Sequence, residues 1–391
     1  MTELQGIAAR SARWLDESAL PLWASRGFDA SRGAFEEQLD FSGAPVASAP
    51  RRVMVQARQI AVYAAAALSG RYPAGKALAL RAARSMIETY LAVDGAAGWV
   101  FAADRDGRVV DGRRDLYAHA FVLFALAWAM RLDRDPKFEA AATATLAMLD
   151  GPFADPAHGG YWDCLPRADD LRRQNPHMHL FEAFIAFYET TGRAELLERC
   201  RSLCALALSR FFDPATGALR EVFDNQWTVY PRPGAGSVEP GHLYEWAWLL
   251  RRFEAIGGQV ENGAVGALMA LASRAGFDAT RDRVVDEIGE DGALRAASSR
   301  AWPHAEALKA LAEEVAHGGG DASPAIGAIL TRLQGVYCRA ELNGGWVDHV
   351  DAQDRPISKA MPASTLYHLY FGISAATAFL VVPGAVKTIQ R

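Results

Sequence analysis

Apolar residues recur along most of this chain at the three- and four-residue intervals of amphipathic helices. Strand-like alternation is confined to short pieces such as Gly98-Trp99-Val100-Phe101 and Gly345-Trp346-Val347. Connections rich in glycine, proline and aspartate, such as FADPAHGGYWD, are typical of turns and short hairpins. The pattern therefore predicts an all-α protein with short β-hairpins in its loops.

Six of the most apolar segments repeat in register. They begin at Arg58, His119, His179, His242, His304 and His368, and these leading residues are 61, 60, 63, 62 and 64 positions apart. The chain has only nine histidines, so five in register are hard to assign to chance. A second amphipathic segment, such as PKFEAAATATLAMLD, lies between successive members, so each period holds two helices and a loop.

Six helical hairpins of this length fit a closed toroid, the (α/α)6 barrel, with six inner helices around an axis and six outer helices around them. An open solenoid is the alternative, but the atypical polar repeats that cap the two ends of a solenoid are not evident. No linker or break in composition divides the chain. We therefore predict a single barrel domain over residues 1–391.

The register has a geometric consequence for the six leading residues. Matching positions on successive inner helices lie at one level around a barrel axis, so all six residues are expected to ring a single pocket. The alternative is six unrelated capping or packing residues. Buried imidazoles without partners cost free energy, which favours the shared pocket.

Further polar and aromatic groups are expected beside this pocket. They are Tyr117, Asn175, Glu182, Arg232, Glu245 and Trp302, with Lys359 and Tyr367 just before His368. Aromatic faces beside hydrogen-bonding groups suit a sugar, which offers CH patches and hydroxyls together. Histidines suit proton transfer near neutral pH, and Glu245, one helical turn after His242, is expected to orient that imidazole. Arg58 and Arg232 are expected to stabilise a developing negative charge.

Composition excludes several other classes of protein. The net charge of −5 and the absence of any Lys/Arg tract argue against nucleic acid as a partner. No signal peptide or membrane-spanning segment is evident, and the four cysteines form no secreted disulfide framework, so a reducing cytoplasm is expected. No cofactor motif is found. His177, His179 and Glu182 resemble a metal set, but residues two apart lie on different helix faces, so no metal is predicted. The sequence does not decide whether the protein forms a homodimer.

At this point the motifs are similar to those of a known family. They are VMVQARQ around Arg58, DLYAHAF around His119, NPHMHLFEA around His179, EPGHLYEWAWLL around His242, WPHAEALKA around His304 and STLYHLY around His368. Together, over roughly residues 10–380, they resemble the N-acylglucosamine 2-epimerase family, which includes sugar 2-epimerases and mannose and other aldose–ketose isomerases. The resemblance implies an (α/α)6 barrel and metal-independent proton transfer at a sugar carbon next to a carbonyl.

The resemblance also assigns roles. It implies that His242 and His368 are the acid/base pair, and that Arg58, Asn175, His179, Arg232 and Glu245 match the other motif positions. Tyr117, His119, Glu182, Trp302 and His304 are expected to contact the sugar as well.

In the implied reaction the sugar ring opens and one histidine removes the C2 proton, which gives a cis-enediolate. Reprotonation at C2 from the opposite face gives the epimer, and reprotonation at C1 gives the ketose, so the motifs leave epimerase and isomerase open. An unmodified hexose such as mannose, glucose or fructose is favoured over a phosphorylated one, because no basic cluster stands out beyond Arg58 and Arg232. N-acylglucosamine also stays open. The alternatives of another class are a glycoside hydrolase using Glu182 and Glu245, which leaves the histidines unexplained, and a non-catalytic sugar-binding or scaffold protein.

Overall fold

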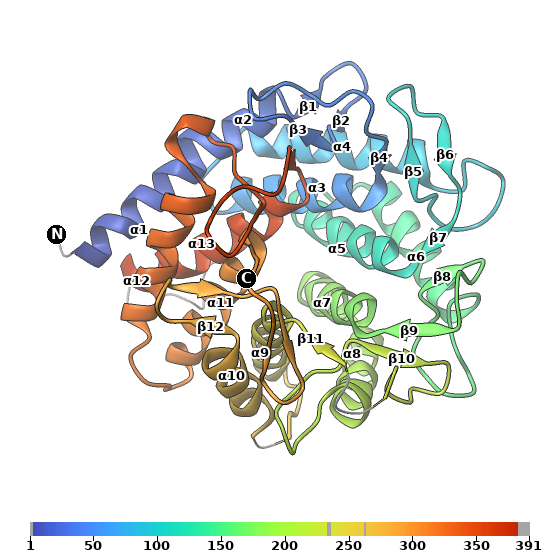
Figure 1. The fold of residues 1–391 in the computed structure, drawn as a ribbon. Coiled ribbons are helices and arrows are strands. Elements are labelled where there is room, and N and C mark those ends of the chain that lie inside the picture. Colours follow the sequence, from blue (N-terminus) through green and yellow to red (C-terminus); the bar gives the residue numbers. More distant parts are fainter. Residues whose placement is uncertain (1–2, 233–235, 262, 382–391) are drawn as a thin grey trace.

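The computed structural model describes residues 3–232, 236–261 and 263–381, and its helices form two concentric rings (Figure 1). The inner ring consists of α3 (Val53–Leu68), α5 (Leu116–Leu132), α7 (Gln174–Thr191), α9 (Pro240–Ala255), α11 (Ala301–Ala316) and α13 (Thr365–Val381). Each inner helix packs against the next, and α13 packs against α3 to close the ring.

The outer ring covers the inner one helix by helix. Its members are α4 (Gly75–Tyr90), α6 (Pro136–Asp150), α8 (Ala194–Leu206), α10 (Ala264–Ala275), α12 (Ser323–Arg332) and, from the start of the chain, α1 (Glu3–Trp14). Helix α1 packs against both α12 and α13, so the first helix of the chain covers the last one. The predicted (α/α)6 barrel is confirmed, while the single domain over residues 1–391 stays a prediction.

The burial of each helix follows from its residues. Fourteen of the 17 residues of α5 are buried, because its sequence is apolar on every side, whereas α6 buries only seven of 15 along one stripe. Aspartates start both helices: the Asp115 carboxylate accepts a hydrogen bond from the backbone N–H of Ala118, and that of Asp135 accepts one from Lys137. The two helices thus share an aspartate cap and differ in how much of their surface is buried.

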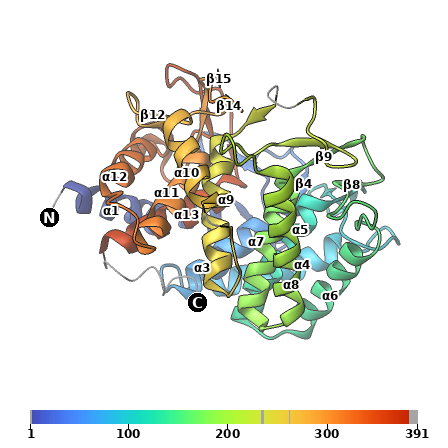
Figure 2. The ribbon, with the colours of Figure 1, turned by 90° about the horizontal axis from the view of Figure 1, so that it is seen from below.

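Short strands and turns connect the helices, and Figure 2 shows several of them gathered at one end of the barrel. The strands are β1 (Phe28–Asp29), β2 (Ala34–Phe35), β3 (Gln38–Leu39), β4 (Arg51–Arg52), β5 (Ala102–Ala103), β6 (Val109–Asp111), β7 (Arg114–Asp115), β8 (Cys164–Leu165), β9 (Leu171–Arg173), β10 (Val222–Asp224), β11 (Ser237–Val238), β12 (Phe277–Asp278), β13 (Arg283–Val284), β14 (Glu287–Gly289), β15 (Leu294–Ala296), β16 (Ser299–Arg300), β17 (His349–Val350) and β18 (Met361–Pro362). The remaining helical pieces are α2 (Leu20–Ser25), the π-turns Leu15–Ala19, Ala207–Phe211 and Leu333–Tyr337, and the 3-10 turn Ala340–Leu342. All the strand pairs are antiparallel, as short hairpins and neighbouring loops allow.

Three buried histidines fasten these loops to the inner helices. The Nδ1 atoms of His119, His177 and His304 lie 2.7, 3.0 and 2.8 Å from the carbonyl oxygens four residues earlier. A carbonyl only accepts, so Nδ1 carries the hydrogen and Nε2 is the acceptor. Nε2 accepts the backbone N–H of Trp99, Tyr161 and Val284 at 3.1, 3.0 and 3.1 Å, respectively. We call these three residues the locking histidines.

The equivalent place on α3 is held by Gln56. Its side-chain amide accepts the N–H of Phe35 at 2.7 Å and donates to the carbonyl of Phe35 at 2.8 Å. In the loop held by His119, Gly98 directly precedes Trp99, the residue whose N–H the imidazole accepts. Gly98 has φ +86°, and a Cβ at this position would lie 3.0 Å from the Nε2 atom of His119. The lock therefore depends on both the helix residue and its loop.

The expectation that six leading residues ring one pocket is wrong for His119 and His304. Both nitrogens of each ring are taken up by backbone groups, so neither imidazole has an atom left for a ligand. Residues two apart on a helix are rotated by about 200°, so the positions two residues later, Phe121 and Glu306, face the axis instead. Cys200, Cys204 and Cys338 are unpaired and buried. No helix of the described chain is long and apolar enough to cross a membrane.

Candidate active site

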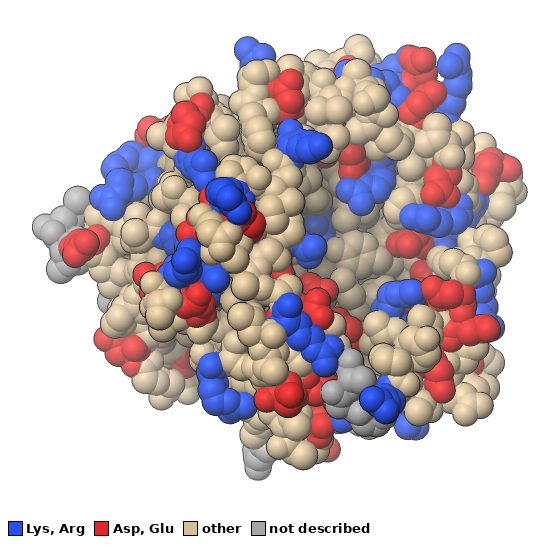
Figure 3. All heavy atoms as spheres, viewed as in Figure 1, with Lys and Arg blue, Asp and Glu red and all other residues tan. Residues whose placement is uncertain are grey.

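The inner helices all begin at the same end of the barrel, where the face shown in Figure 3 is hollowed near its centre and bears acidic and basic side chains around the hollow. The first two turns of these helices carry Arg58, Tyr117, Asn175, His179, His242, Trp302 and His368. Side chains one turn further along each helix lie about 4.5 Å deeper along the axis. The site therefore has an upper layer at the mouth and a lower layer beneath it.

His242 is held by a hydrogen-bond network on one side of the site. Its Nδ1 atom lies 2.9 Å from Oε1 of Glu221, in the loop before β10. The indole N–H of Trp246 donates to the amide oxygen of Gln174 at 2.7 Å, which turns the Gln174 NH2 group toward Glu221, 2.8 Å away, and toward His242. With Nδ1 donating to the carboxylate, Nε2 of His242 is the nitrogen left for a substrate.

His368 is held in the same way from a different helix. Its Nδ1 atom lies 2.6 Å from Oε1 of Glu306 on α11. The other carboxylate oxygen of Glu306 lies 2.5 Å from the Nζ atom of Lys309, one turn further along α11. His368 thus also presents Nε2, and its carboxylate partner is itself paired with a buried cation.

Trp302 lies between the two imidazoles. Its ring centroid is 5.2 Å from that of His242 and 5.5 Å from that of His368, and it is tilted against both. Gly241 allows this approach, because a Cβ at that position would lie 2.5 Å from the indole ring. The half-buried indole therefore separates the two histidines and offers a flat apolar face between them.

A cation and two aromatic rings occupy the other side of the site. The Arg58 guanidinium lies 4.1 Å from the ring centroid of Phe121 and donates to the hydroxyl of Tyr117 and to the carbonyl of Ser364. Its Nε atom is buried and has no hydrogen-bond partner among the described residues. The ring of Tyr117 also packs edge-on against His179, with 4.9 Å between the centroids. Arg58 is therefore fixed in position, with a donor unused.

Three buried carboxylates form the lower layer with Lys309. Glu182 accepts from the Tyr367 hydroxyl and lies 3.2 Å from Nδ1 of His179, while Glu245 lies 3.8 Å from the same nitrogen. Neither oxygen of Glu245 has a hydrogen-bond partner in the described part of the chain. Burial and the neighbouring charges of Glu306 and Glu182 raise the pKa of Glu245 well above its ordinary value. The carboxyl group of Glu245 can therefore donate or accept a hydrogen bond toward the upper layer of the site.

The surroundings push the pKa values of the two imidazoles apart. Burial alone would lower the pKa of His242, but the nearby carboxylates, above all Glu221 and then Glu239, raise it to about 10. Burial, together with the positive charges of Arg58 and Lys309, holds the pKa of His368 well below its ordinary value. At neutral pH His242 is therefore an imidazolium and His368 a neutral imidazole. One acid and one base are ready at the same site.

Three sets of described side chains could surround a cation: Glu221, Glu239 and His242 at the mouth, and two deeper sets. The deeper sets are His179, Glu182 and Glu245, and Glu245, Glu306 and His368, and within each set the ligand atoms lie within 4.8 Å of one another. The ammonium of Lys309 already supplies positive charge to the second deeper set. The arrangement can carry out acid–base chemistry with its own residues.

The remaining predicted residues lie at the edge of the site. Asn175 is half-buried at the start of α7, and its Oδ1 atom has no hydrogen-bond partner among the described residues. Arg232 is exposed, immediately before the residues 233–235 that the structure does not describe. Sequence reasoning missed Glu221, Gln174, Glu306 and Lys309. Glu306 has a signal in the sequence, since it lies two positions after His304, as His179 lies two after His177.

The comparison with known proteins identifies the family of the chain. The profile of N-acylglucosamine 2-epimerase (GlcNAc 2-epimerase) matches residues 33–372. The chain belongs to the N-acylglucosamine 2-epimerase family. It is a sugar epimerase or isomerase, and the predicted family membership is confirmed.

Individual relatives of this family member carry different names. A mannose-6-phosphate isomerase of Rhizobium meliloti (strain 1021) is 33% identical over 377 residues, which cover 94% of this chain and 95% of that protein. The structure of cellobiose 2-epimerase from Spirochaeta thermophila DSM 6192 has a TM-score of 0.83 at 21% identity and covers 96% of this chain and 98% of its own. A crystal structure of D-mannose isomerase has a TM-score of 0.82 at 20% identity and covers 92% and 95%. These structural likenesses establish the fold.

Proposed function

We propose that this protein transfers a proton at C2 of an open-chain aldose of the mannose type, using His242 and His368 as acid and base. The observation that carries the proposal is the pair of imidazoles on either side of Trp302. Each has Nδ1 held by a carboxylate, and they differ in charge at neutral pH. A base and an acid at one site suit a reaction that removes one proton and delivers another.

The proposed reaction starts from the open-chain aldehyde. Nε2 of neutral His368 takes the proton from C2, and the electron pair moves to the C1 oxygen to give a cis-enediolate. Arg58, with its unpaired Nε, offsets the charge on the C1 oxygen. For the ketose, His368 returns the proton to C1, and His242 gives its proton to the C1 oxygen and takes the proton of the C2 hydroxyl in exchange. For the 2-epimer, His242 delivers its proton to the opposite face of C2, and the electron pair returns from the C1 oxygen to restore the aldehyde. In both cases the enzyme ends with the same number of protons.

Isomerisation to the ketose is our first candidate for the product. The relative that covers nearly the whole chain is named a mannose-6-phosphate isomerase, and a 33% identical partial relative from Thermobifida fusca is named a D-mannose isomerase. Epimerisation is the second candidate, because a cellobiose 2-epimerase of Bacteroides fragilis is 27% identical over 248 residues.

We propose an unphosphorylated hexose as the substrate. A cavity of about 300 Å³ adjoins Glu221 and includes Arg173 and Arg220 in its lining. Each of these arginines is already paired with two carboxylates, Asp163 and Asp169 in one case and Asp213 and Glu290 in the other. Neither guanidinium is therefore free for a phosphate there. The name of the bacterial relative makes mannose 6-phosphate the necessary comparison substrate.

The test is incubation of the protein with mannose or mannose 6-phosphate in D2O, followed by NMR. Fructose or its 6-phosphate identifies isomerisation, and deuterium at C2 of the glucose form identifies epimerisation. His242→Asn and His368→Asn are expected to lower turnover at least about 10³-fold, while retaining sugar binding. No deuterium exchange into either aldose by the wild type, or full exchange by both variants, would contradict the proposal.

The hydrolase alternative receives no support from the geometry. Glu182 and Glu245 lie one turn below His179 and His242, and Glu182 is held by the Tyr367 hydroxyl and His179. A glycoside hydrolase needs its two carboxyl groups on either side of the scissile bond. Here the imidazoles, not the carboxylates, are the upper pair.

A further inference from the structure

Lys309 is the one buried lysine among the residues that the structure describes. The chain has 41 basic residues, of which five are lysines and the other 36 arginines. Lys76, Lys137 and Lys359 are exposed, whereas Lys309 is 1% exposed in the middle of the inner helix α11. Lysines are almost never fully buried unless they are paired. Its placement therefore needs an explanation.

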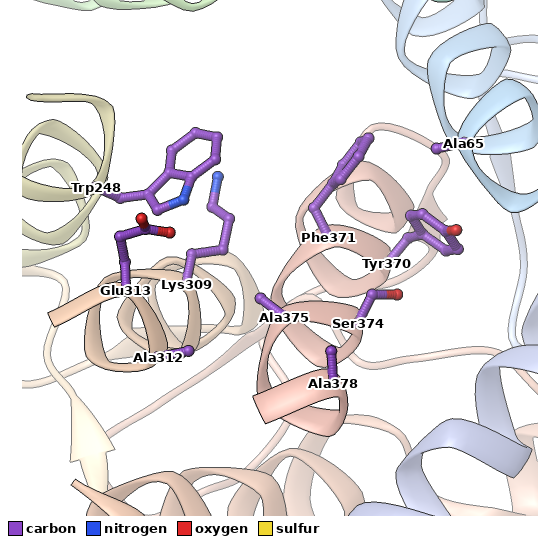
Figure 4. Close-up of a pocket in the computed structure, with 10 residues that line it drawn as sticks. All are labelled: Ala65, Trp248, Lys309, Ala312, Glu313, Tyr370, Phe371, Ser374, Ala375 and Ala378. Atoms are coloured by element: carbon purple, nitrogen blue, oxygen red, sulfur yellow. The ribbon is translucent and has the colours of Figure 1, made fainter. Parts of the chain in front are cut away.

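Carboxylates lie near the ammonium of Lys309, and aromatic rings lie beside its side chain. Figure 4 shows the side chain extending from α11 beside the ring of Trp248, with Phe371 of α13 across the gap. The Nζ atom lies 4.0 Å from the Trp248 ring centroid and 2.5 Å from Oε2 of Glu306. Burial alone would lower the pKa of this ammonium, but Glu306, followed by Glu245 and Glu182, raises it above its ordinary value. Lys309 is the cation of the lower layer.

Folding alone is a weak reason for this arrangement. Desolvation of a buried ion pair offsets most of its Coulombic gain, so apolar residues of similar size often serve stability equally well. The pair is, however, one step from a residue that faces the substrate, because the second oxygen of Glu306 holds Nδ1 of His368. Lys309, Glu306 and His368 thus form a continuous chain of contacts from the barrel interior to the sugar site.

We propose that Lys309 is a positioning residue of the active site. Its ammonium holds Glu306 as an ionised carboxylate turned toward His368, and Glu306 presents His368 as a neutral base with Nε2 toward the sugar. This inference rests on the proposed function, in which His368 exchanges a proton with the substrate. Without Lys309, the buried carboxyl of Glu306 would favour its protonated form. It would then no longer fix the hydrogen on Nδ1.

The charge that His368 experiences comes from several helices. The titratable or charged side chains that face it are Arg58 of α3, His179 and Glu182 of α7, Glu245 of α9, Glu306 and Lys309 of α11, and Tyr367 beside it on α13. Arg58 and Lys309 are the two permanent cations of this set. Removing Lys309 leaves the carboxylates in excess, so an imidazole with an unchanged tautomer should bind its proton more tightly.

The experiment is an NMR titration of the histidine side chains in the full chain. The wild type and Lys309→Met, which keeps the length of the side chain without its charge, are labelled with ¹³C and ¹⁵N histidine, and His368→Asn assigns the resonance. In Lys309→Met we expect the pKa of His368 to rise by about 1–3 units, or its hydrogen to move from Nδ1 to Nε2. The kcat value should fall at least about tenfold, with KM changed less than about threefold. Lys137→Met, at an exposed site on α6, is the matched control and should leave His368 unchanged.

A purely structural lysine would give a different result. If Lys309→Met lowers the melting temperature but leaves the pKa and the tautomer of His368 as in the wild type, the proposal is overturned. Should this variant not fold, Lys309→Met/Glu306→Gln removes the buried charges as a pair, and wild-type titration of His368 in that variant also overturns the proposal. The NMR titration of His368 does not require the protein to convert a substrate. A wild type that converts no aldose therefore refutes the proposed function, and the His368 measurement still decides the role of Lys309.

Discussion

The charge on His242 is the feature of the proposed mechanism that a single substitution tests most directly. Glu221→Gln removes the carboxylate charge but retains an oxygen that can accept the hydrogen of Nδ1. The pKa of His242 is about 10, which is about 3.5 units above the ordinary value and corresponds to about 5 kcal/mol of differential interaction. Glu221 makes the largest favourable contribution, followed by Glu239 and Glu245. We take its share as about half, which predicts a fall of about 2 units.

A pKa near 8 in the variant has a specific kinetic signature. At pH 9 about nine-tenths of His242 is an imidazolium in the wild type, against about one-tenth in Glu221→Gln, so kcat should fall about tenfold there. At pH 7 both proteins are mostly protonated, and this effect disappears. The assay is kcat and kcat/KM for the aldose between pH 6 and 10. Glu314→Gln, at the opposite end of the inner helices, is the control.

The same substitution has a thermodynamic signature of defined sign. Because the folded-state pKa of His242 is raised, the stability that its charge contributes is fully present below pH 6.5 and is lost as the pH rises through about 10. The melting temperatures of the wild type and Glu221→Gln should therefore differ most below about pH 8, the pKa expected in the variant, and converge toward pH 10. An alkaline limb of the rate profile that stays in place, together with a constant difference in melting temperature, would refute the reasoning.

Substitutions at two further positions test the lock and the indole between the imidazoles. His304→Ala leaves the Val284 N–H without a partner and opens a cavity, with an expected loss of about 3–5 kcal/mol in calorimetry, whereas His304→Gln, which imitates Gln56, should lose less than half as much. The pKa of His304 is about 3. The stability that its neutral ring contributes is therefore present above pH 6.5 and is lost as the pH falls through 6.5 toward 3. At pH 5 the wild type should have lost about 2 kcal/mol of unfolding free energy in this way, and His304→Gln should show no such loss. Gly241→Ala should displace Trp302 and raise KM about tenfold or more in steady-state kinetics, and an unchanged KM would show that the indole does not contact the sugar.

The repeat and the barrel could be predicted because both depend on periodic apolar residues. The intervals of 60 to 64 residues reflect one inner and one outer helix per unit, and the structure keeps this order around the ring. The placement of single side chains could not be predicted at the same precision. An error of two residues turns a side chain by about 200°, from the axis toward the loops. For this reason the sequence pattern places His119 and His304 at the site and not Glu306.

Long-range partners set a second limit on sequence reasoning. Glu245, one turn from His242, was expected to orient it, but Glu221, which belongs to a loop 21 residues earlier, holds Nδ1. No periodicity places that loop residue against the helix. Lys309 was hidden for a different reason, because a lysine within an amphipathic helix ordinarily points to solvent. Only the closed ring shows that every side of α11 is covered.

The locking histidines have a consequence for how this barrel can be diversified. Each one fastens a loop at the mouth to the inner helix of its own hairpin, so the loop's conformation is specified within a contiguous stretch of chain. A hairpin transplanted between members of the family, from the fastened residue through the helix that bears its histidine or glutamine, would carry its own anchoring with it. Substrate preference could then be exchanged one loop at a time, while the ring of inner helices keeps the two imidazoles in place. Chimeras cut between the fastened residue and its anchor should fold poorly.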